Sequence, residues 1–172
     1  MNQEDIKRIE ESIGYEFSNR ALPEQAFTTK AHANEDPDAE HYGLLEHSGD
    51  KWLEITVHHA IMTHRTRIDE KRRLVSEYNK DDMFRLEDRI VNNKNLAARM
   101  EDLDLEQYLI MSQGEKQNHC ENSLSIRSKL FEAIIGAVAV DSGYDLKVIS
   151  RVVLRMRGAT DWEELLSRHE EA

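Results

Sequence analysis

Residues 44–53 (LLEHSGDKWL) and 128–137 (SKLFEAIIGA) are two apolar stretches with helical spacing, and each carries carboxylates among its hydrophobic residues. Glu46 and Asp50 stand four residues apart in the first stretch, so they share one face of a helix. Glu132 lies in the middle of the second stretch. Burying a carboxylate is costly unless it is paired or binds a cation. The two stretches therefore predict one acidic site built between two helices.

The other apolar residues of the chain also repeat mostly with helical spacing. The 172 residues include only 2 Pro and 7 Gly, a scarcity of helix breakers that favours an all-α domain. We expect the main helices over about 42–64 and 124–140, with the second at the centre of the core. A short terminal helix is expected after Thr160 as its cap. Polar or charged connections are expected at 34–40, 65–82 and 112–121.

Composition limits the classes of protein that the chain can belong to. Its formal net charge is −11, so it has no general attraction for nucleic acid, and any such contact must come from local basic groups or bridging cations. Cys120 is the only cysteine, which excludes a disulfide within the chain and favours an intracellular protein, cytoplasmic or nuclear. The N-terminus has no signal or transit pattern, and no apolar run is long enough to span a membrane.

Five motifs in order along the chain resemble the catalytic domain of the ribonuclease III family. The segment at 45–50 (LEHSGD) resembles the family signature Leu-Glu-Phe-Leu-Gly-Asp, and 131–143 (FEAIIGAVAVDSG) resembles its second signature. The other three motifs are 9–17 (IEESIGYEF), 25–30 (QAFTTK) and 90–97 (IVNNKNLA). The resemblance covers roughly residues 5–156, and five motifs in family order make a chance match unlikely.

This resemblance implies an all-α, ribonuclease-III-like endonuclease domain over 1–172, with a core at about 5–156 and a short helical extension at 160–172. The family forms homodimers and cuts double-stranded RNA with a divalent metal, Mg²⁺ or Mn²⁺. Carried over to this sequence, Glu46, Asp50 and Glu132 match three of the four main metal-site acids of the family and are the expected catalytic residues.

The chain departs from the family pattern at several positions. Lys129 stands where the fourth metal-site acid, an Asp, is expected, so a ligand is replaced by a positive charge. Gly43 replaces the acid that opens the first signature. His47 and Ser48 replace an apolar pair that helps dimer packing, which weakens the expectation of a homodimer. By its spacing, Glu70 is a candidate accessory acid. The chain is also expected to lack the double-stranded RNA-binding domain.

These departures leave two functions open. The first is a metal-dependent endonuclease for double-stranded RNA, attenuated by Lys129. The second is a catalytically inactive relative that serves as an RNA-binding or dimerisation scaffold. A third interpretation is a helical interaction protein with no role in RNA chemistry, and only the acidic composition of the chain favours it.

Several basic side chains could serve the RNA functions. Lys51 and Arg127 are candidate RNA contacts near the site, and Lys51 could instead only screen the charge of the acids. Four arginines of the charged segment could bind phosphates or form a solvated, salt-bridged face, and these are Arg65, Arg67, Arg72 and Arg73.

Overall fold

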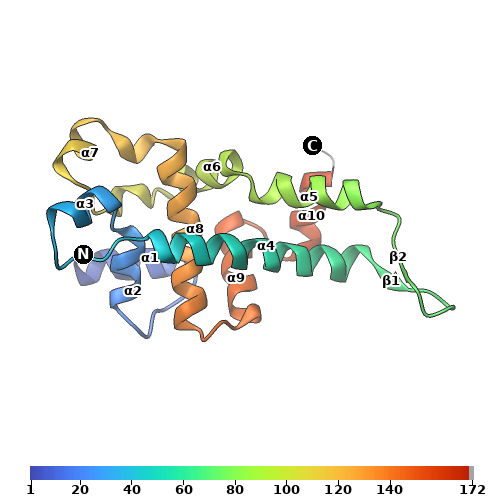
Figure 1. The fold of residues 1–172 in the computed structure, drawn as a ribbon. Helices are drawn as coiled ribbons and strands as arrows, with labels where there is room; N and C mark the ends of the chain where they lie inside the picture. The colour runs from blue at the N-terminus through green and yellow to red at the C-terminus, as the bar shows by residue number, and fades with distance from the viewer. Residues whose placement is uncertain (171–172) are drawn as a thin grey trace.

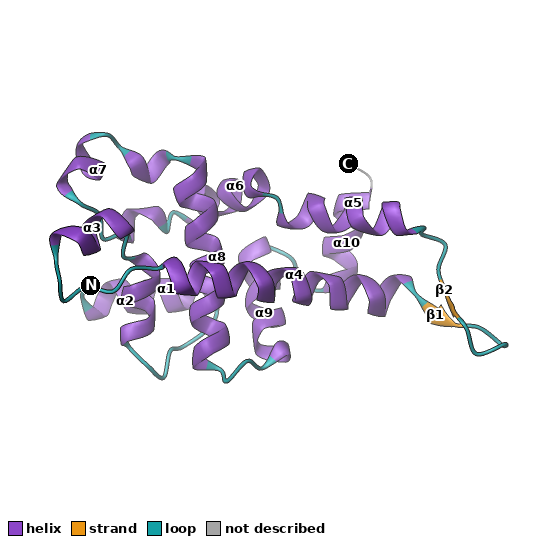
Figure 2. Cartoon of the chain, in the orientation of Figure 1, coloured by secondary structure: helices purple, strands orange, loops and turns teal. Residues whose placement is uncertain are grey.

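The computed structural model describes residues 1–170, and its regular structure consists mainly of helices, as the sequence predicts (Figures 1 and 2). The α-helices are α1 (Gln3–Ile13), α2 (Ala21–Phe27), α3 (Lys30–Glu35), α4 (Gly43–Arg65), α5 (Lys80–Val91), α6 (Asn93–Leu103), α7 (Gln113–Gln117), α8 (Leu124–Asp141), α9 (Leu146–Arg157) and α10 (Trp162–Glu170). Short 3₁₀ turns, η1 (Glu106–Tyr108) and η2 (Cys120–Asn122), and a hairpin of β1 (Arg67–Ile68) and β2 (Leu74–Val75) complete the described chain.

Helix α8 is the centre of the core, as expected from its composition. Its residues from Leu130 to Ala139 are all buried, and α4, α6, α2 and α9 pack around it. Helix α4 crosses α8 and continues well beyond it (Figure 1). The N-terminal part of α4 packs through Leu45, Gly49 and Leu53, which recur at four-residue intervals on one face. Burying each such leucine stabilises the fold by roughly 1.5–3 kcal/mol relative to an exposed one.

Local signals in the sequence account for most of the helix ends. Gly14 ends α1 in the left-handed conformation, with a φ of 69°, which glycine adopts without steric strain. The expected loop at 112–121 is wrong in part, because Ser112 and Glu115 form a capping box that starts the short helix α7. The expected cap at Thr160 is also corrected. The Asp161 side chain accepts the N–H of Glu164 at 2.9 Å, and Thr160 instead donates to the Glu164 carboxylate.

The second half of α4 forms an elongated part of the molecule with α5 beside it and the β1–β2 hairpin at its tip (Figure 1). Helix α10 packs against α4, α5 and α9 and so ties this part to the rest of the chain. The hairpin pairs Arg67 with Val75 and Ile68 with Leu74 in antiparallel register. Over residues 1–170, none of the helices has both the length and the apolar character required to span a bilayer.

Candidate active site at the crossing of two helices

The crossing of α4 and α8 is a contact between the two backbones. A Cβ atom added to Gly49 would lie 1.7 Å from the carbonyl oxygen of Glu132, and one added to Gly136 would lie 1.9 Å from the carbonyl oxygen of Leu45. Only glycine permits so close an approach. Glu46 and Asp50 follow Leu45 and Gly49 directly in sequence. The crossing therefore brings their helix face next to Glu132.

Glu132 is the buried carboxylate of this crossing, with 7% of its surface exposed. Burial raises its pKa to about 7, with further increases from the negative charges of Asp50 and Glu46. Lys129 lowers the pKa, but this effect is smaller than the combined effect of burial and the acids. The structure thus brings Glu46, Asp50, Glu132 and Lys129 into one electrostatic cluster, in which negative charge is only partly compensated.

Glu54 belongs to the same cluster, although it lies outside the sequence motifs that indicated the other acids. It lies four residues after Asp50 on α4 and also raises the pKa of Glu132. The spacing Glu46, Asp50, Glu54 was the signal that could have identified it. The ammonium of Lys51 lies 2.9 Å from a carboxylate oxygen of Asp50 and 2.9 Å from one of Glu54. Hydrogen bonds to Glu54 and Asp50 raise the pKa of Lys51.

The structure separates two other expected residues from this cluster. Arg127 pairs with Glu101 at 3.1 Å and with Glu106 at 2.7 Å, and only 13% of its side chain is exposed. It is therefore occupied by a structural ion pair and is poorly placed to bind RNA. Glu70 lies in the connection between β1 and β2, past the C-terminal end of α4. The part of α4 from Glu46 to its end at Arg65 has about 20 residues and, at 1.5 Å per residue, is roughly 30 Å long. Glu70 lies beyond that end and therefore does not join the acids.

The donor chemistry of the cluster can be compared with the needs of a divalent metal. Carboxylate oxygens are the ligands that Mg²⁺ prefers. The pKa of Glu132 is raised mainly by burial and further by the negative charges of Asp50 and Glu46, which Lys129 offsets only in part. Within the described residues, however, no three His, Cys, Asp or Glu side chains are gathered closely enough to hold a metal ion. The carboxylates of Glu46, Asp50 and Glu132 therefore fit a hard cation by their chemistry, whereas their side chains in this structure are not gathered around one point.

Comparison with known proteins identifies what the chain resembles over most of its length. A family model described as ribonuclease-III-like matches residues 19–156. Ribonuclease 3 from Treponema succinifaciens is 34% identical over 156 residues, which cover 91% of this chain and 42% of that protein. The chain spans about half the length of the curated relatives it matches.

Two solved structures of the nuclease domain of ribonuclease III from Campylobacter jejuni share this fold. One has a TM-score of 0.74 and 25% identity, and covers 91% of this chain and 95% of that domain. The other has a TM-score of 0.73 and 26% identity, with coverages of 88% and 94%, and is described as flexible in a region involved in dimer formation.

Proposed function

We propose a function from the premise that this chain belongs to the ribonuclease-III-like family. The chain is proposed to hydrolyse phosphodiester bonds of double-stranded RNA with the help of Mg²⁺ or Mn²⁺. Residues 1–172 are proposed to form one nuclease domain. The expected core at about 5–156 is too short, because Leu165 and Leu166 of α10 are buried in the same core. The relatives named ribonuclease 3 support the reaction class, and the all-α fold supports the comparison with their nuclease domains.

The observation that carries this proposal is the acid cluster at the crossing of α4 and α8. Glu132 remains difficult to ionise even with Lys129 beside it, because burial and the carboxylates of Asp50 and Glu46 dominate. A cluster with excess negative charge is destabilising unless a cation or protons compensate it. We therefore assign Glu46, Asp50 and Glu132 as the residues that would hold the cation.

The metal and the residues at the crossing would each have a distinct role in hydrolysis. A bound Mg²⁺ or Mn²⁺ supplies Lewis-acid polarisation of a phosphate oxygen and stabilises negative charge that develops during hydrolysis. The backbone contact at Gly49 and Gly136 fixes the separation of the two helices that carry the carboxylates. Lys51, paired with Asp50 and Glu54, restrains the Asp50 carboxylate. Glu132, with a pKa of about 7, can hold or release a proton near neutral pH.

Lys129 is expected to weaken this activity without removing the other acids. Two unit charges of the same sign about 5 Å apart repel by roughly 3 kcal/mol at an effective dielectric near 20, and a divalent ion carries twice the unit charge. Repulsion of this size corresponds to a loss of at least about a hundredfold in cation affinity. The proposed enzyme therefore needs more divalent metal than a family member with an Asp at this position.

The test is a cleavage assay on double-stranded RNA with Mg²⁺ and Mn²⁺, using the wild type, Lys129→Asp and Glu132→Gln. Lys129→Asp is expected to raise cleavage about a hundredfold at limiting metal, and Glu132→Gln to abolish it while the helical circular dichroism is retained. Cleavage by Glu132→Gln at the wild-type rate would exclude Glu132 as a ligand. Absence of cleavage by the wild type and by Lys129→Asp would refute the nuclease proposal.

A second candidate function is a catalytically inactive scaffold that binds RNA or dimerises. Two observations favour it: Lys51 already pairs with Asp50, and Lys129 partly compensates Glu132 from within the fold. In this case the wild type binds double-stranded RNA in EDTA but neither binds Mn²⁺ nor cuts the RNA. Isothermal titration with Mn²⁺ alone separates the two candidates, because only the nuclease requires the metal.

Assembly follows from the same family premise. We propose that the chain forms a homodimer. The nuclease domain from Campylobacter jejuni, which has a region involved in dimer formation, supports this proposal. His47 is exposed and Ser48 is half-buried on α4, where the family has an apolar pair, so the dimer is expected to be weak. Sedimentation equilibrium over a range of protein concentrations measures its dissociation constant. An intracellular location remains part of the proposal.

A further inference from the structure

The charge of the β1–β2 hairpin is opposite to that of the protein as a whole. The formal net charge of the chain is −11, whereas the nine residues from Arg67 to Val75 contain four basic and only two acidic side chains. The hairpin lies at the tip of the elongated part of the molecule (Figure 1). A basic group concentrated in this way creates a local positive potential on an acidic protein.

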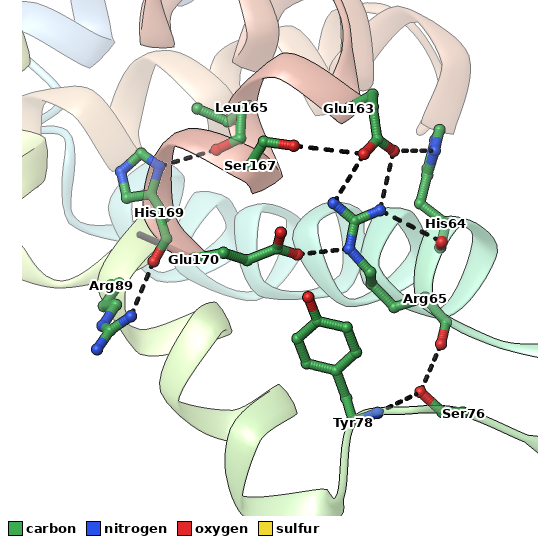
Figure 3. Close-up of polar contacts among 10 residues, drawn as sticks. All are labelled: His64, Arg65, Ser76, Tyr78, Arg89, Glu163, Leu165, Ser167, His169 and Glu170. Carbon is green, nitrogen blue, oxygen red and sulfur yellow. Dashed lines mark hydrogen bonds and ion pairs between the residues drawn. The ribbon is translucent and has the colours of Figure 1, made fainter. Parts of the chain in front are cut away.

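Not all arginines of this segment are available to a partner. Arg65, at the end of α4, has only 10% of its side chain exposed, and it binds Glu163 through two nitrogens and Glu170 through a third (Figure 3). Arg73 binds the carboxylate of Asp69 at 2.7 Å. Both side chains are therefore used to stabilise the fold itself.

Three exposed cations remain on the hairpin, at Arg67, Lys71 and Arg72. Among the residues that the structure describes, none of the three takes part in an ion pair. These three unpaired cations lie within six residues of a chain rich in acids, so their positive charge is free to bind phosphates.

The hairpin is held in one conformation by its own hydrogen bonds. The N–H of Asp69 donates to the carbonyl of Arg73 at 2.9 Å, and the N–H of Arg72 donates back to the carbonyl of Asp69 at 2.9 Å. The Asp69 carboxylate also accepts the N–H of Arg73 at 2.8 Å. These bonds and the Arg73 guanidinium lower the pKa of Asp69, so the turn stays ion-paired at neutral pH.

The base of the hairpin is tied to the body of the molecule by the contacts of Figure 3. The Ser76 hydroxyl donates to the carbonyl of Arg65, whose guanidinium is bound by α10. Arg89 of α5 donates to the carbonyl of His169 in α10 at 2.9 Å. A basic tip with a fixed base loses little conformational entropy on binding, which favours affinity.

We propose that the β1–β2 hairpin is a second contact for double-stranded RNA, in which Arg67, Lys71 and Arg72 bind backbone phosphates. This inference rests on the proposed function, since the same duplex would reach the crossing of α4 and α8. About 16 residues of α4, roughly 25 Å, separate Gly49 from the end of the helix. A nucleic-acid duplex carries a charge about every 1.7 Å, so one duplex lying along α4 offers phosphates to both places.

The test measures binding of a blunt-ended duplex RNA, longer than α4, by fluorescence anisotropy in EDTA over a series of salt concentrations. The triple variant Arg67→Gln, Lys71→Gln, Arg72→Gln is compared with a control that neutralises three exposed cations on α6 and α9: Lys94→Gln, Lys147→Gln, Arg151→Gln. Both variants have the same net charge. We expect the hairpin variant to bind at least tenfold more weakly at low salt, and its log K against log salt to be less steep by about 2 to 3, near 0.9 for each lost phosphate contact.

Glu70→Gln provides a variant with the opposite effect, because it removes an exposed negative charge from the hairpin. It is expected to tighten binding severalfold, which a misfolded hairpin would not do. Equal losses for the two triple variants, or an unchanged salt slope, would overturn the hairpin proposal while the nuclease proposal stands. A wild type that binds no duplex RNA, in EDTA or with Mg²⁺, would overturn both proposals.

Discussion

The two ends of α4 are fixed by different kinds of interaction. Near its N-terminal end, Gly49 lets α4 touch the backbone of α8, and this contact brings carboxylates together around the buried Glu132. At its C-terminal end, Arg65 is held by carboxylates of α10, and the basic hairpin follows directly. The first end depends on close packing and carries negative charge that Lys51 and Lys129 compensate only in part. The second depends on ion pairs and presents positive charge. One helix thus joins a proposed site of chemistry to a proposed RNA contact, and each end should respond to different perturbations.

The largest effect is expected from Gly136→Ala, which tests whether packing fixes the first end. The new methyl group would lie 1.9 Å from the carbonyl oxygen of Leu45, so the two helices must separate. We expect a loss of more than about 4 kcal/mol in the free energy of unfolding, measured with urea. Gly114→Ala is the matched control, because its Cβ meets nothing within 4 Å. It should stay within about 1 kcal/mol of wild type, and similar behaviour of both variants would contradict a rigid crossing.

Glu132→Gln tests whether the crossing stores unfavourable charge. The pKa of Glu132 is raised from 4.5 to about 7 in the folded protein, so the folded state binds its proton more tightly than the unfolded chain. Stability from this group is complete below about pH 4.5 and is lost as pH rises through 7. Removing the charge should therefore stabilise the metal-free protein by about 3 kcal/mol at pH 8 and hardly at all at pH 4.5.

The control for this variant is Glu35→Gln, at an exposed position in the last turn of α3. Its unfolding free energy should match wild type at both pH values. If Glu132→Gln were no more stable than wild type at pH 8, then the Glu132 carboxylate would already be fully compensated, and the crossing would not need a cation. If Glu132→Gln is more stable than wild type but cannot cut RNA, then the Glu132 carboxylate lowers the stability of the fold and is required for cleavage.

Arg65→Gln tests the ion pairs of the second end. The guanidinium of Arg65 is mostly buried and binds two carboxylates, and glutamine cannot replace its charge or its fork of donors. The exposed position of Glu163 limits the loss, and we expect about 2 kcal/mol from urea denaturation. Arg73→Gln removes a pair in which the arginine is 65% exposed, and it should change stability by less than about 1 kcal/mol. Equal losses would mean that burial of Arg65 adds nothing.

Sequence periodicity predicts the first end better than the second. The spacing of Glu46 and Asp50 places them on one helix face, and the small residues of α8 predict a close neighbour. Their proximity to Glu132 follows from the crossing, whereas their role as metal ligands stays a prediction. Glu54 was missed because the family signature ends at Asp50, although the same four-residue spacing extends to it.

Ion pairs are harder to predict, because a long basic side chain can reach several acids that only the tertiary structure brings near. Arg127 was expected to face RNA, yet α6 and η1 supply Glu101 and Glu106 as its partners. Glu70 has the sequence spacing of an accessory acid, but the hairpin carries it away from the cluster. Spacing along the chain predicts a position in space only while the helix continues, and α4 ends at Arg65.

The smallest effect is expected at His169, where the second end should respond to pH in the direction opposite to Glu132. The Nδ1 of His169 lies 2.9 Å from the carbonyl oxygen of Leu165, and Nε2 lies 2.9 Å from a guanidinium nitrogen of Arg157. This arrangement fits a neutral ring that donates from Nδ1 and accepts at Nε2. Burial lowers the pKa of His169 despite the Leu165 carbonyl, and the charges of Arg157, Arg168 and Arg89 lower it further.

Because the folded pKa of His169 lies below the unfolded value near 6.5, the unfolded state binds the proton more readily, and stability falls as pH drops below about 6.5. Glu132 changes stability with the opposite sign over the same range, so the measurement belongs in the Glu132→Gln background. There, acidification from pH 7.5 should destabilise the protein, and adding His169→Gln should flatten that dependence. A dependence that survives His169→Gln would assign it to other groups, and α10 would then be held independently of the protonation of this imidazole.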